Sequence, residues 1–265
     1  MIQRSLRRTR SRRPRRLGLG PSLLFVLALP GAAAAEEAVV AVAANFAEVA
    51  ERLEELFEEG GGHTVTFVVG STGKLYAQIA HGAPFDAFLA ADRERPERLE
   101  REGLAVAGSR FTYAVGRLTL WSREPGRVGT DGAATLTQGD FRLLAIANPD
   151  LAPYGEAARK TLQSLGLWEG VQAKVVRGQT VGQAHALVAS GSAELGLVAL
   201  SSVLSPRNEV PGSRWDVPAE LHAPIRQDAV LLKRGAGNAA ARGFLELLRS
   251  DPARPVLETY GYGVE

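Results

Sequence analysis

The chain has 265 residues, with 31 Lys and Arg, 29 Asp and Glu, and no cysteine. Because cysteine is missing, the sequence excludes a disulfide framework, a thiolate metal site, a cysteine nucleophile and a lipid anchor on an N-terminal cysteine. The net charge of +2 is unevenly spread, since eight basic residues lie in the first sixteen positions and residues 36–265 carry 23 basic against 29 acidic residues. This acidic body does not suit a nucleic-acid partner.

The N-terminus has the three parts of a secretory signal peptide. A basic arm is followed by the apolar run 17–30 and by alanines at 32–35, which provide an Ala-x-Ala site. A transmembrane anchor is the alternative, but Pro21 and Pro30 interrupt the run, which falls short of the ~20 residues needed to span a bilayer. We expect residues 1–35 to be a signal peptide cleaved near Ala35 and the mature protein to be periplasmic. The paired arginines leave the twin-arginine and general export routes both open.

Apolar runs and helical patterns alternate along the first part of the body. Strands are predicted where every residue is apolar, as in buried parallel sheets, and helices where apolar residues recur every three or four positions. The predicted strands are 38–44, 65–70 and 85–90. The predicted helices are 46–57, a second whose apolar stripe begins with Leu75, Tyr76 and Ile79, and a third at 95–102. This β-α-β-α-β order indicates a parallel sheet with right-handed crossovers.

A long strand at 112–121 is predicted to leave this first unit. The second unit has predicted strands at 143–147, 173–177 and 195–200 and predicted helices at 156–165 and 182–189. A Pro/Gly-rich crossing follows at 206–224, then a strand at 227–233 and an amphipathic helix around 244–248. Two α/β lobes, each with a mostly parallel sheet flanked by helices, fit this order better than one sheet.

At four places a strand-like run ends at a polar residue that opens a helix: 44–45, 70–73, 148–154 and 179–181. Helix N-termini carry unpaired N–H groups and about half a positive charge, so four of them around one crevice would bind an anion without a cation. Such turns lie at the carboxyl ends of parallel strands, where open α/β sheets bind ligands.

Local signals support the helix starts at these turns. Asn45 with Glu48, and Thr180 with Gln183, have the spacing of a capping box. Pro153 suits a first helical position, which puts Tyr154 in the first turn. An ordinary cap explains each turn taken alone, and only their repetition favours an anion site.

The sequence gives little support for nucleotide binding, metal coordination or catalysis. The segment 68–75 resembles a phosphate loop but has Val68 and Leu75 where that motif needs Gly and Ser or Thr. The four histidines show no metal spacing, and no nucleophile–base pattern is present. We therefore expect no catalytic residue, no cofactor and no protein-coordinated metal ion, and we interpret Asp86 as structural.

Seven segments together resemble one family, the periplasmic molybdate/tungstate-binding proteins of ABC transporters (ModA). In chain order they are residues 42–46, 70–79, 82–88, 109–116, 147–155, 181–187 and 211–215. The resemblance implies a two-lobed periplasmic-binding-protein fold of the type II solute-binding class. Lobe I would comprise residues 36–114 plus 225–265, and lobe II residues 115–224.

The resemblance also implies a ligand set. By position, the oxyanion-binding residues would be Ala44, Asn45, Ser71, Thr72, Tyr154 and, through its backbone N–H, Val181. Ala44 replaces a hydroxyl-bearing residue of this branch of the family. Ala199 occupies the place of a ligating tyrosine in another branch, so here Tyr154 would supply the hydroxyl.

The expected function is that of an extracytoplasmic solute-binding protein. It would capture molybdate or tungstate between its lobes as a monomer, deliver it to a membrane ABC permease and do no chemistry. A receptor for another tetrahedral or organic anion, such as sulfate or phosphate, is the first alternative. An exported enzyme on a two-lobed scaffold is the second.

Overall fold

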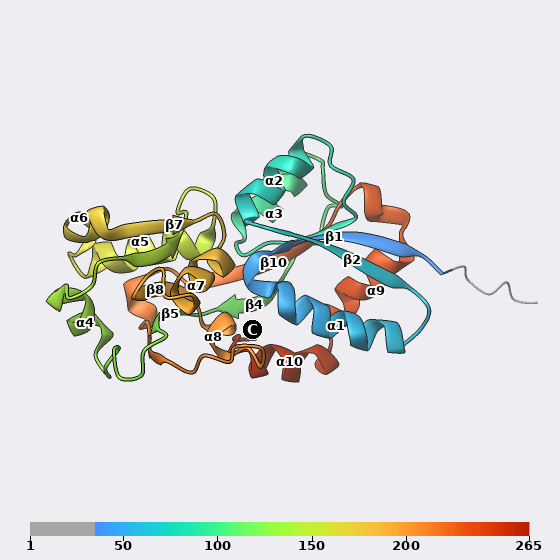
Figure 1. Ribbon diagram of the computed structural model, residues 1–265. Helices are drawn as coiled ribbons and strands as arrows, with labels where there is room; N and C mark the ends of the chain where they lie inside the picture. Colours follow the sequence, from blue (N-terminus) through green and yellow to red (C-terminus); the bar gives the residue numbers. More distant parts are fainter. Residues whose placement is uncertain (1–34, 265) are drawn as a thin grey trace, which may run out of the picture. The chain divides into compact units, whose positions relative to one another are not determined.

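The computed structural model describes residues 35–264, which belong to one compact unit (Figure 1). Residues 1–34, on which the predictions of a signal peptide and of its export route rest, lie outside the described residues. Within residues 35–264, no helix is both long and apolar enough to cross a membrane.

The described part contains two five-stranded sheets. The first has the order β2-β1-β3-β10-β4, formed by β1 (Glu37–Ala43), β2 (Thr64–Gly70), β3 (Ala87–Leu89), β4 (Phe111–Gly116) and β10 (Ile225–Leu231). The second has the order β7-β6-β8-β5-β9, formed by β5 (Leu118–Ser122), β6 (Leu144–Ala147), β7 (Val175–Gly178), β8 (Leu195–Ala199) and β9 (Ser213–Asp216). In each sheet one strand, β10 or β5, runs against the other four. The predicted α/β fold with two mostly parallel sheets is confirmed.

Helical segments connect these strands. The α-helices are α1 (Ala47–Glu59), α2 (Thr72–Ala80), α3 (Glu94–Arg101), α4 (Gly132–Gln138), α5 (Pro153–Ser164), α6 (Trp168–Val171), α7 (Val181–Ala189), α8 (Leu200–Leu204), α9 (Ala239–Leu248) and α10 (Arg254–Thr259). The 3₁₀ segments are η1 (Ala44–Phe46), η2 (Gln172–Lys174), η3 (Ala219–Leu221), η4 (Arg234–Gly237) and η5 (Asp251–Ala253).

The first sheet is covered on both faces, which explains why β1 is apolar at every position from Ala38 to Ala43. Val40 and Val42 belong to the core that includes residues of α1 and α9, whereas Ala41 belongs to the core that includes residues of α2 and α3. Figure 1 shows α2 and α3 on one face of β1 and α1 and α9 on the other. Alternating strand side chains therefore each meet a helix.

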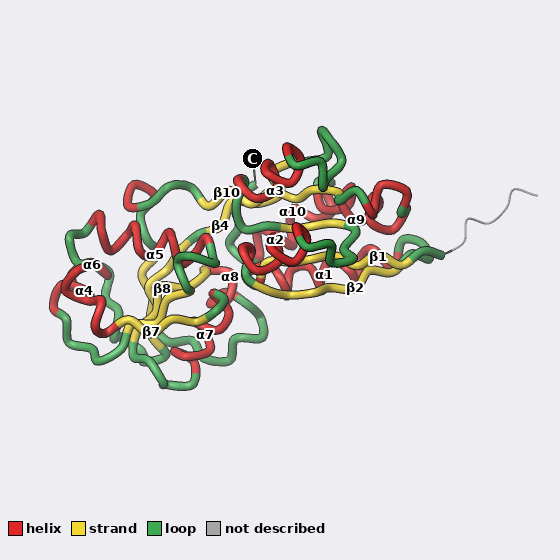
Figure 2. Tube along the Cα trace, turned by 90° about the horizontal axis from the view of Figure 1, so that it is seen from above, coloured by secondary structure: helices red, strands yellow, loops and turns green. Residues whose placement is uncertain are grey.

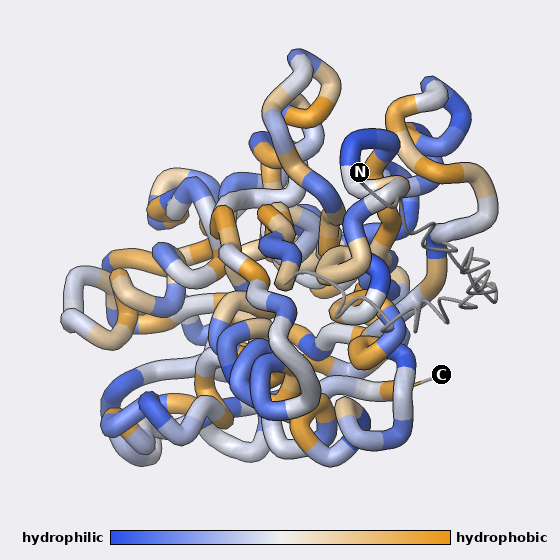
Figure 3. The backbone as a smooth tube through the Cα atoms, turned by 90° about the vertical axis from the view of Figure 1, so that its right-hand side faces the viewer, coloured by the Kyte–Doolittle hydropathy of each residue, from blue (hydrophilic) through white to orange (hydrophobic). Residues whose placement is uncertain are grey.

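The second sheet follows the same plan. Helices α5 and α7 both contact β6 and β8, and Figure 2 shows them on the two sides of these strands. In Figure 3, hydrophobic and hydrophilic residues alternate along the helices, as expected for helices that rest one face on a sheet. In both sheets, then, the inner strands are buried, and helices begin after the carboxyl ends of β1, β2, β6 and β7.

The long strand predicted at 112–121 is divided between the sheets. Its first part is β4 and its second part β5, with Arg117 at the division. The chain returns through the segment predicted as a crossing loop, which also adds β9 to the second sheet before β10 begins at Ile225. The interruption falls at Gly116 and the exposed Arg117, and the strands on its two sides pair in different sheets.

Gly116, at the end of β4, permits a close approach. A Cβ at this position would overlap the Tyr154 hydroxyl oxygen and lie 2.6 Å from Gln227 Nε2. Only a residue without a side chain leaves room for both groups.

We expect Gly116→Ala to lower the free energy of unfolding by about 1 to 3 kcal/mol, the usual cost of overpacking a buried site. Urea denaturation measures this change. Gly129→Ala is the control, since nothing lies within 4 Å of its added Cβ. Equal stability of the two variants would contradict the close approach.

Candidate functional site

All six predicted ligand residues line one small cavity. The lining comes from both sheets and their helices: Ala43, Ala44, Asn45, Gly70, Ser71, Thr72, Ala91, Ala152, Pro153, Tyr154, Thr180 and Val181. The N-terminal ends of η1, α2, α5 and α7 meet here, each after a strand whose neighbour is parallel. The four predicted turns therefore converge.

Backbone donors are available at each of these helix starts. Among the bonds of residues 35–264, none uses the N–H of Asn45, Thr72, Tyr154 or Val181. Such first-turn N–H groups have no acceptor within their own helix, and the helix dipole adds partial positive charge at the same place. The cavity can thus supply N–H donors from four directions.

The cavity contains no ionic side chain. None of its lining residues, all within the described part of the chain, is Asp, Glu, Lys, Arg or His. A buried anion would therefore depend on dipoles and neutral donors for its stabilisation. Larger hollows elsewhere, such as the one beside Asp92, Lys160 and His222, are lined by both acidic and basic side chains.

Ser71 and Thr72 begin α2 and are buried, at 4% and 1% exposure. Ser71 is the N-cap residue, but its side chain makes no capping bond. Thr72 Oγ1 accepts a hydrogen bond from Ala91 N at 3.0 Å, which orients the hydroxyl and leaves its own hydrogen for another partner. Both hydroxyls can donate to an acceptor in the cavity.

Tyr154 stands in the first turn of α5, after Pro153 at the predicted first position. Burial raises the pKa of the Tyr154 hydroxyl well above its ordinary value, and the neighbouring hydroxyls of Tyr262 and Tyr113 raise it further. The group therefore keeps its hydrogen and remains a donor at neutral pH. Its oxygen accepts from Gln227 Nε2 at 3.4 Å.

The prediction that Asn45 caps a helix is wrong. Asn45 lies in η1, and Phe46 is the N-cap residue of α1. The Asn45 amide turns inward, where Nδ2 donates to Gln227 Oε1 at 2.8 Å and to Tyr262 Oη at 3.0 Å. Both amide hydrogens are thereby used, which leaves the backbone N–H as the donor that Asn45 offers the cavity.

At α7, the predicted capping interaction is present. Thr180 Oγ1 accepts from Gln183 N at 3.1 Å, and Gln183 Oε1 accepts from Gln179 N at 2.8 Å. Gln183 thus reaches one residue further back than in a standard capping box. The cap leaves the N–H of Val181 free at the cavity.

The two halves of the protein also contact each other around the cavity. Gly73 N donates to Leu151 O at 2.9 Å, and Ser201 Oγ donates to Asn45 O at 3.1 Å. Further out, Arg207 Nη1 pairs with Glu51 Oε2 at 2.7 Å, although both side chains are exposed. The cavity is therefore bounded by direct bonds between residues of the two halves.

Several polar residues at this seam were not predicted from sequence. Tyr113, Ser201, Gln227 and Tyr262 surround the Asn45 amide and the Tyr154 hydroxyl. One signal was present, since Gln227 is one of three successive polar residues, 226–228, in a strand whose other residues are apolar. Asp86 has the structural role that was predicted, because its carboxylate accepts from Val39 N at 2.8 Å and Arg234 Nη1 at 2.7 Å.

Comparison with known proteins gives consistent matches over nearly the whole body. The family described as bacterial extracellular solute-binding protein matches residues 38–263. The molybdate-binding protein ModA of Azotobacter vinelandii is 50% identical over 234 residues, covering 88% of this chain and 92% of that protein. ModA of Rhodobacter capsulatus is 48% identical over 244 residues, covering 92% of this chain and 94% of that protein.

A solved structure agrees with these matches. The periplasmic molybdate-binding protein of Azotobacter vinelandii superimposes with a TM-score of 0.82 at 41% identity, covering 86% of this chain and 99% of that one.

We expect Thr180→Ala to lower the free energy of unfolding by about 1 kcal/mol, because the substitution removes an N-cap acceptor. Denaturant titration measures the loss. Thr137→Ala is the matched control, since that hydroxyl bonds only to Ala133 O of its own exposed helix. A loss in the control as large as in Thr180→Ala would argue against the cap.

Proposed function

The chain belongs to the ModA family of bacterial extracellular solute-binding proteins, and we propose that it captures molybdate or tungstate in the cavity between its two sheets. The observation that carries this proposal is the convergence of four helix N-termini on a buried cavity without an ionic side chain. A dianion fits such a site because the dipoles oppose its charge and the N–H groups and hydroxyls match its oxygens. The family consists of receptors rather than enzymes, in agreement with the absence of a nucleophile–base pattern from the sequence.

Each proposed contact follows from the local geometry. Asn45 and Val181 would donate through backbone N–H groups, and Ala44 has nothing but its backbone to contribute. Ser71 and Thr72 would donate hydroxyl hydrogens as well. Tyr154 would supply both its N–H and its hydroxyl, since its raised pKa keeps the latter protonated.

Closure of the lobes would complete the site. Residues 36–114 plus 225–265 would move as lobe I and residues 115–224 as lobe II, with hinges near Val115 and Ile225. These positions flank the two chain crossings between the sheets. Because the ligand residues come from both halves, opening the lobes would separate the donors and release the anion.

The transport role implies a location and a partner. We expect export after cleavage near Ala35, a monomer in the periplasm and delivery of the oxyanion to a membrane ABC permease.

Selection among tetrahedral anions would depend on two properties. Sulfate has the same shape and charge as molybdate but shorter bonds, so the size of the cavity discriminates between them. Phosphate retains a hydrogen near neutral pH, which needs an acceptor, whereas the hydroxyls and N–H groups described here act as donors.

We expect residues 36–265 to gain thermal stability with molybdate or tungstate and little with equal sulfate. Ligand at 100 times its dissociation constant adds about 2.7 kcal/mol to the native state. Differential scanning calorimetry checks the shift. Unchanged melting with both metal oxyanions would refute the assignment, and a larger shift with sulfate or phosphate would favour that alternative receptor.

We expect Tyr154→Phe to weaken molybdate binding by about 1 to 3 kcal/mol, the usual cost of leaving a buried polar partner unmatched. Isothermal titration calorimetry measures the loss. Tyr76→Phe is the matched control, since the Tyr76 hydroxyl bonds Glu102 at the exposed surface. Undiminished affinity in Tyr154→Phe would remove this hydroxyl from the site.

A further inference from the structure

We propose that Gln227 is a positioning residue that directs the Tyr154 hydroxyl hydrogen into the oxyanion cavity. Gln227 does not line the cavity. It is fully buried in β10 and contacts both Asn45 and Tyr154, two of the proposed ligand residues. The inference rests on the proposed function, because it concerns how the same site is organised.

The position of Gln227 is set by a β-bulge. Gln227 pairs with Ala114 while Asp228 pairs with Thr112, so Tyr113 on β4 has no partner on β10. A bulge re-aims the extra side chain. Here it brings the Tyr113 hydroxyl to 3.1 Å from Gln227 Oε1 and 3.0 Å from Ala90 O.

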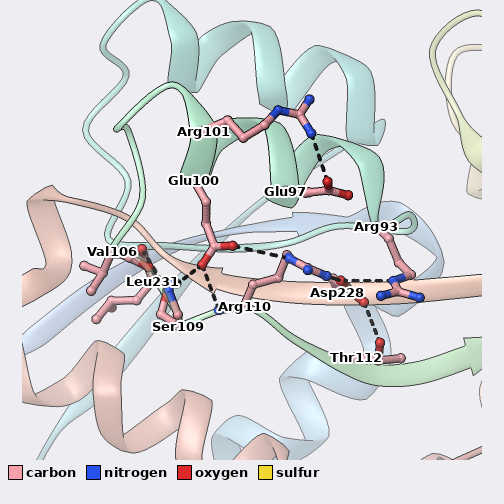
Figure 4. Close-up of polar contacts among 11 residues, drawn as sticks. Arg93, Glu97, Glu100, Arg101, Val106, Ser109, Arg110, Thr112, Asp228 and Leu231 are labelled. Atoms are coloured by element: carbon pink, nitrogen blue, oxygen red, sulfur yellow. Dashed lines mark hydrogen bonds and ion pairs between the residues drawn. The ribbon is translucent and has the colours of Figure 1, made fainter.

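Asp228 anchors the strand on the other side of the bulge. Figure 4 shows its carboxylate held by Arg110, Thr112 and Arg93, with Arg110 also paired to Glu100. Asp228 is fully buried, so these bonds fix the backbone next to Gln227. The register of β10 at this point is therefore rigidly determined.

The direction of the hydrogen bonds can be followed from Tyr262. Its hydroxyl donates to Asn45 O at 2.7 Å, the shortest bond at this seam, so its oxygen is left to accept from Asn45 Nδ2 at 3.0 Å. The second Asn45 amide hydrogen goes to Gln227 Oε1 at 2.8 Å. An amide that accepts through Oε1 presents Nε2 on its other side.

Nε2 of Gln227 faces the Tyr154 hydroxyl, 3.4 Å away, and the glycine at 116 leaves space for the approach. Because Nε2 donates to the Tyr154 oxygen, the Tyr154 hydrogen cannot point back at Gln227. Two acceptors remain for the Tyr154 hydrogen: the oxygen of the neighbouring Tyr262 hydroxyl, which has a second lone pair beside the one used by Asn45, and an oxyanion in the cavity. Because a hydrogen bond to an anion is stronger than one to a neutral hydroxyl, the hydrogen turns to the cavity when the oxyanion is bound.

A double-mutant cycle tests this role. Gln227→Met keeps the side-chain length but removes the donor, and we expect it to lower molybdate affinity about tenfold when Tyr154 is present. In the Tyr154→Phe background the same change should alter affinity less than about twofold, because no hydroxyl remains to direct. Equal losses in both backgrounds would overturn the proposal, since Gln227 would then act on the cavity through Asn45.

A control separates this effect from lost stability. Thr119→Val removes hydrogen bonds from the buried Thr119 hydroxyl to Trp215 O and Asp216 Oδ1 in the second sheet, away from the cavity. It should lower the melting temperature while leaving affinity in both backgrounds unchanged. A loss of affinity comparable to that of Gln227→Met would show that destabilisation alone explains the result.

A second readout needs no ligand. In protein labelled with ¹³C at the tyrosine Cζ atoms, the Tyr154 signal is identified by its loss in Tyr154→Phe, and Gln227→Met should shift it. An unshifted signal would overturn the proposal whether or not molybdate binds. Failure of the wild-type protein to bind any oxyanion, with the signal shifted, would refute the proposed function but leave the Gln227–Tyr154 contact established.

Discussion

The structure depends on one electrostatic constraint, which is that a buried anion needs opposing charge and the cavity has no basic side chain to provide it. Helix dipoles and first-turn N–H groups meet this need without burying a mobile cation. Four helical segments must then begin around one cavity. Two mostly parallel sheets meet this requirement, because the carboxyl ends of parallel strands lie at one edge of each sheet and the following helices begin there. The fold thus follows from what the proposed site requires.

The neutral donors are themselves held by a second layer of bonds. Ala91 N fixes Thr72 Oγ1, Gln183 N fixes Thr180 Oγ1, and the Asn45 amide is fixed by Gln227 and Tyr262. The bonds to Thr72 and Asn45 satisfy buried polar groups, and all of these bonds set which groups remain free to donate. In a low-dielectric interior such a fully satisfied network favours one arrangement over its competitors.

Much of this was predictable from sequence because local signals agree with the fold. Uniformly apolar runs predicted the buried strands, and Pro153 and the Thr180–Gln183 spacing predicted helix starts that the structure confirms. Asn45 was wrongly predicted as a cap, since a capping motif cannot show that a buried partner such as Gln227 competes for the amide. The bulge at Tyr113 also escaped prediction, because it arises from pairing between strands far apart in sequence. The change of sheet at Arg117 lies close to the lobe boundary predicted between residues 114 and 115, although one continuous strand was expected there.

The central claim is that a metal oxyanion is held in this cavity by neutral donors alone. The most direct measurement is a crystal structure with molybdate, with the molybdenum located by its anomalous scattering. Molybdenum is expected between the helix starts at Asn45, Thr72, Tyr154 and Val181, with every protein contact an N–H or hydroxyl group. A molybdenum position beside a lysine or arginine, such as Lys160 in the neighbouring hollow, would contradict this claim.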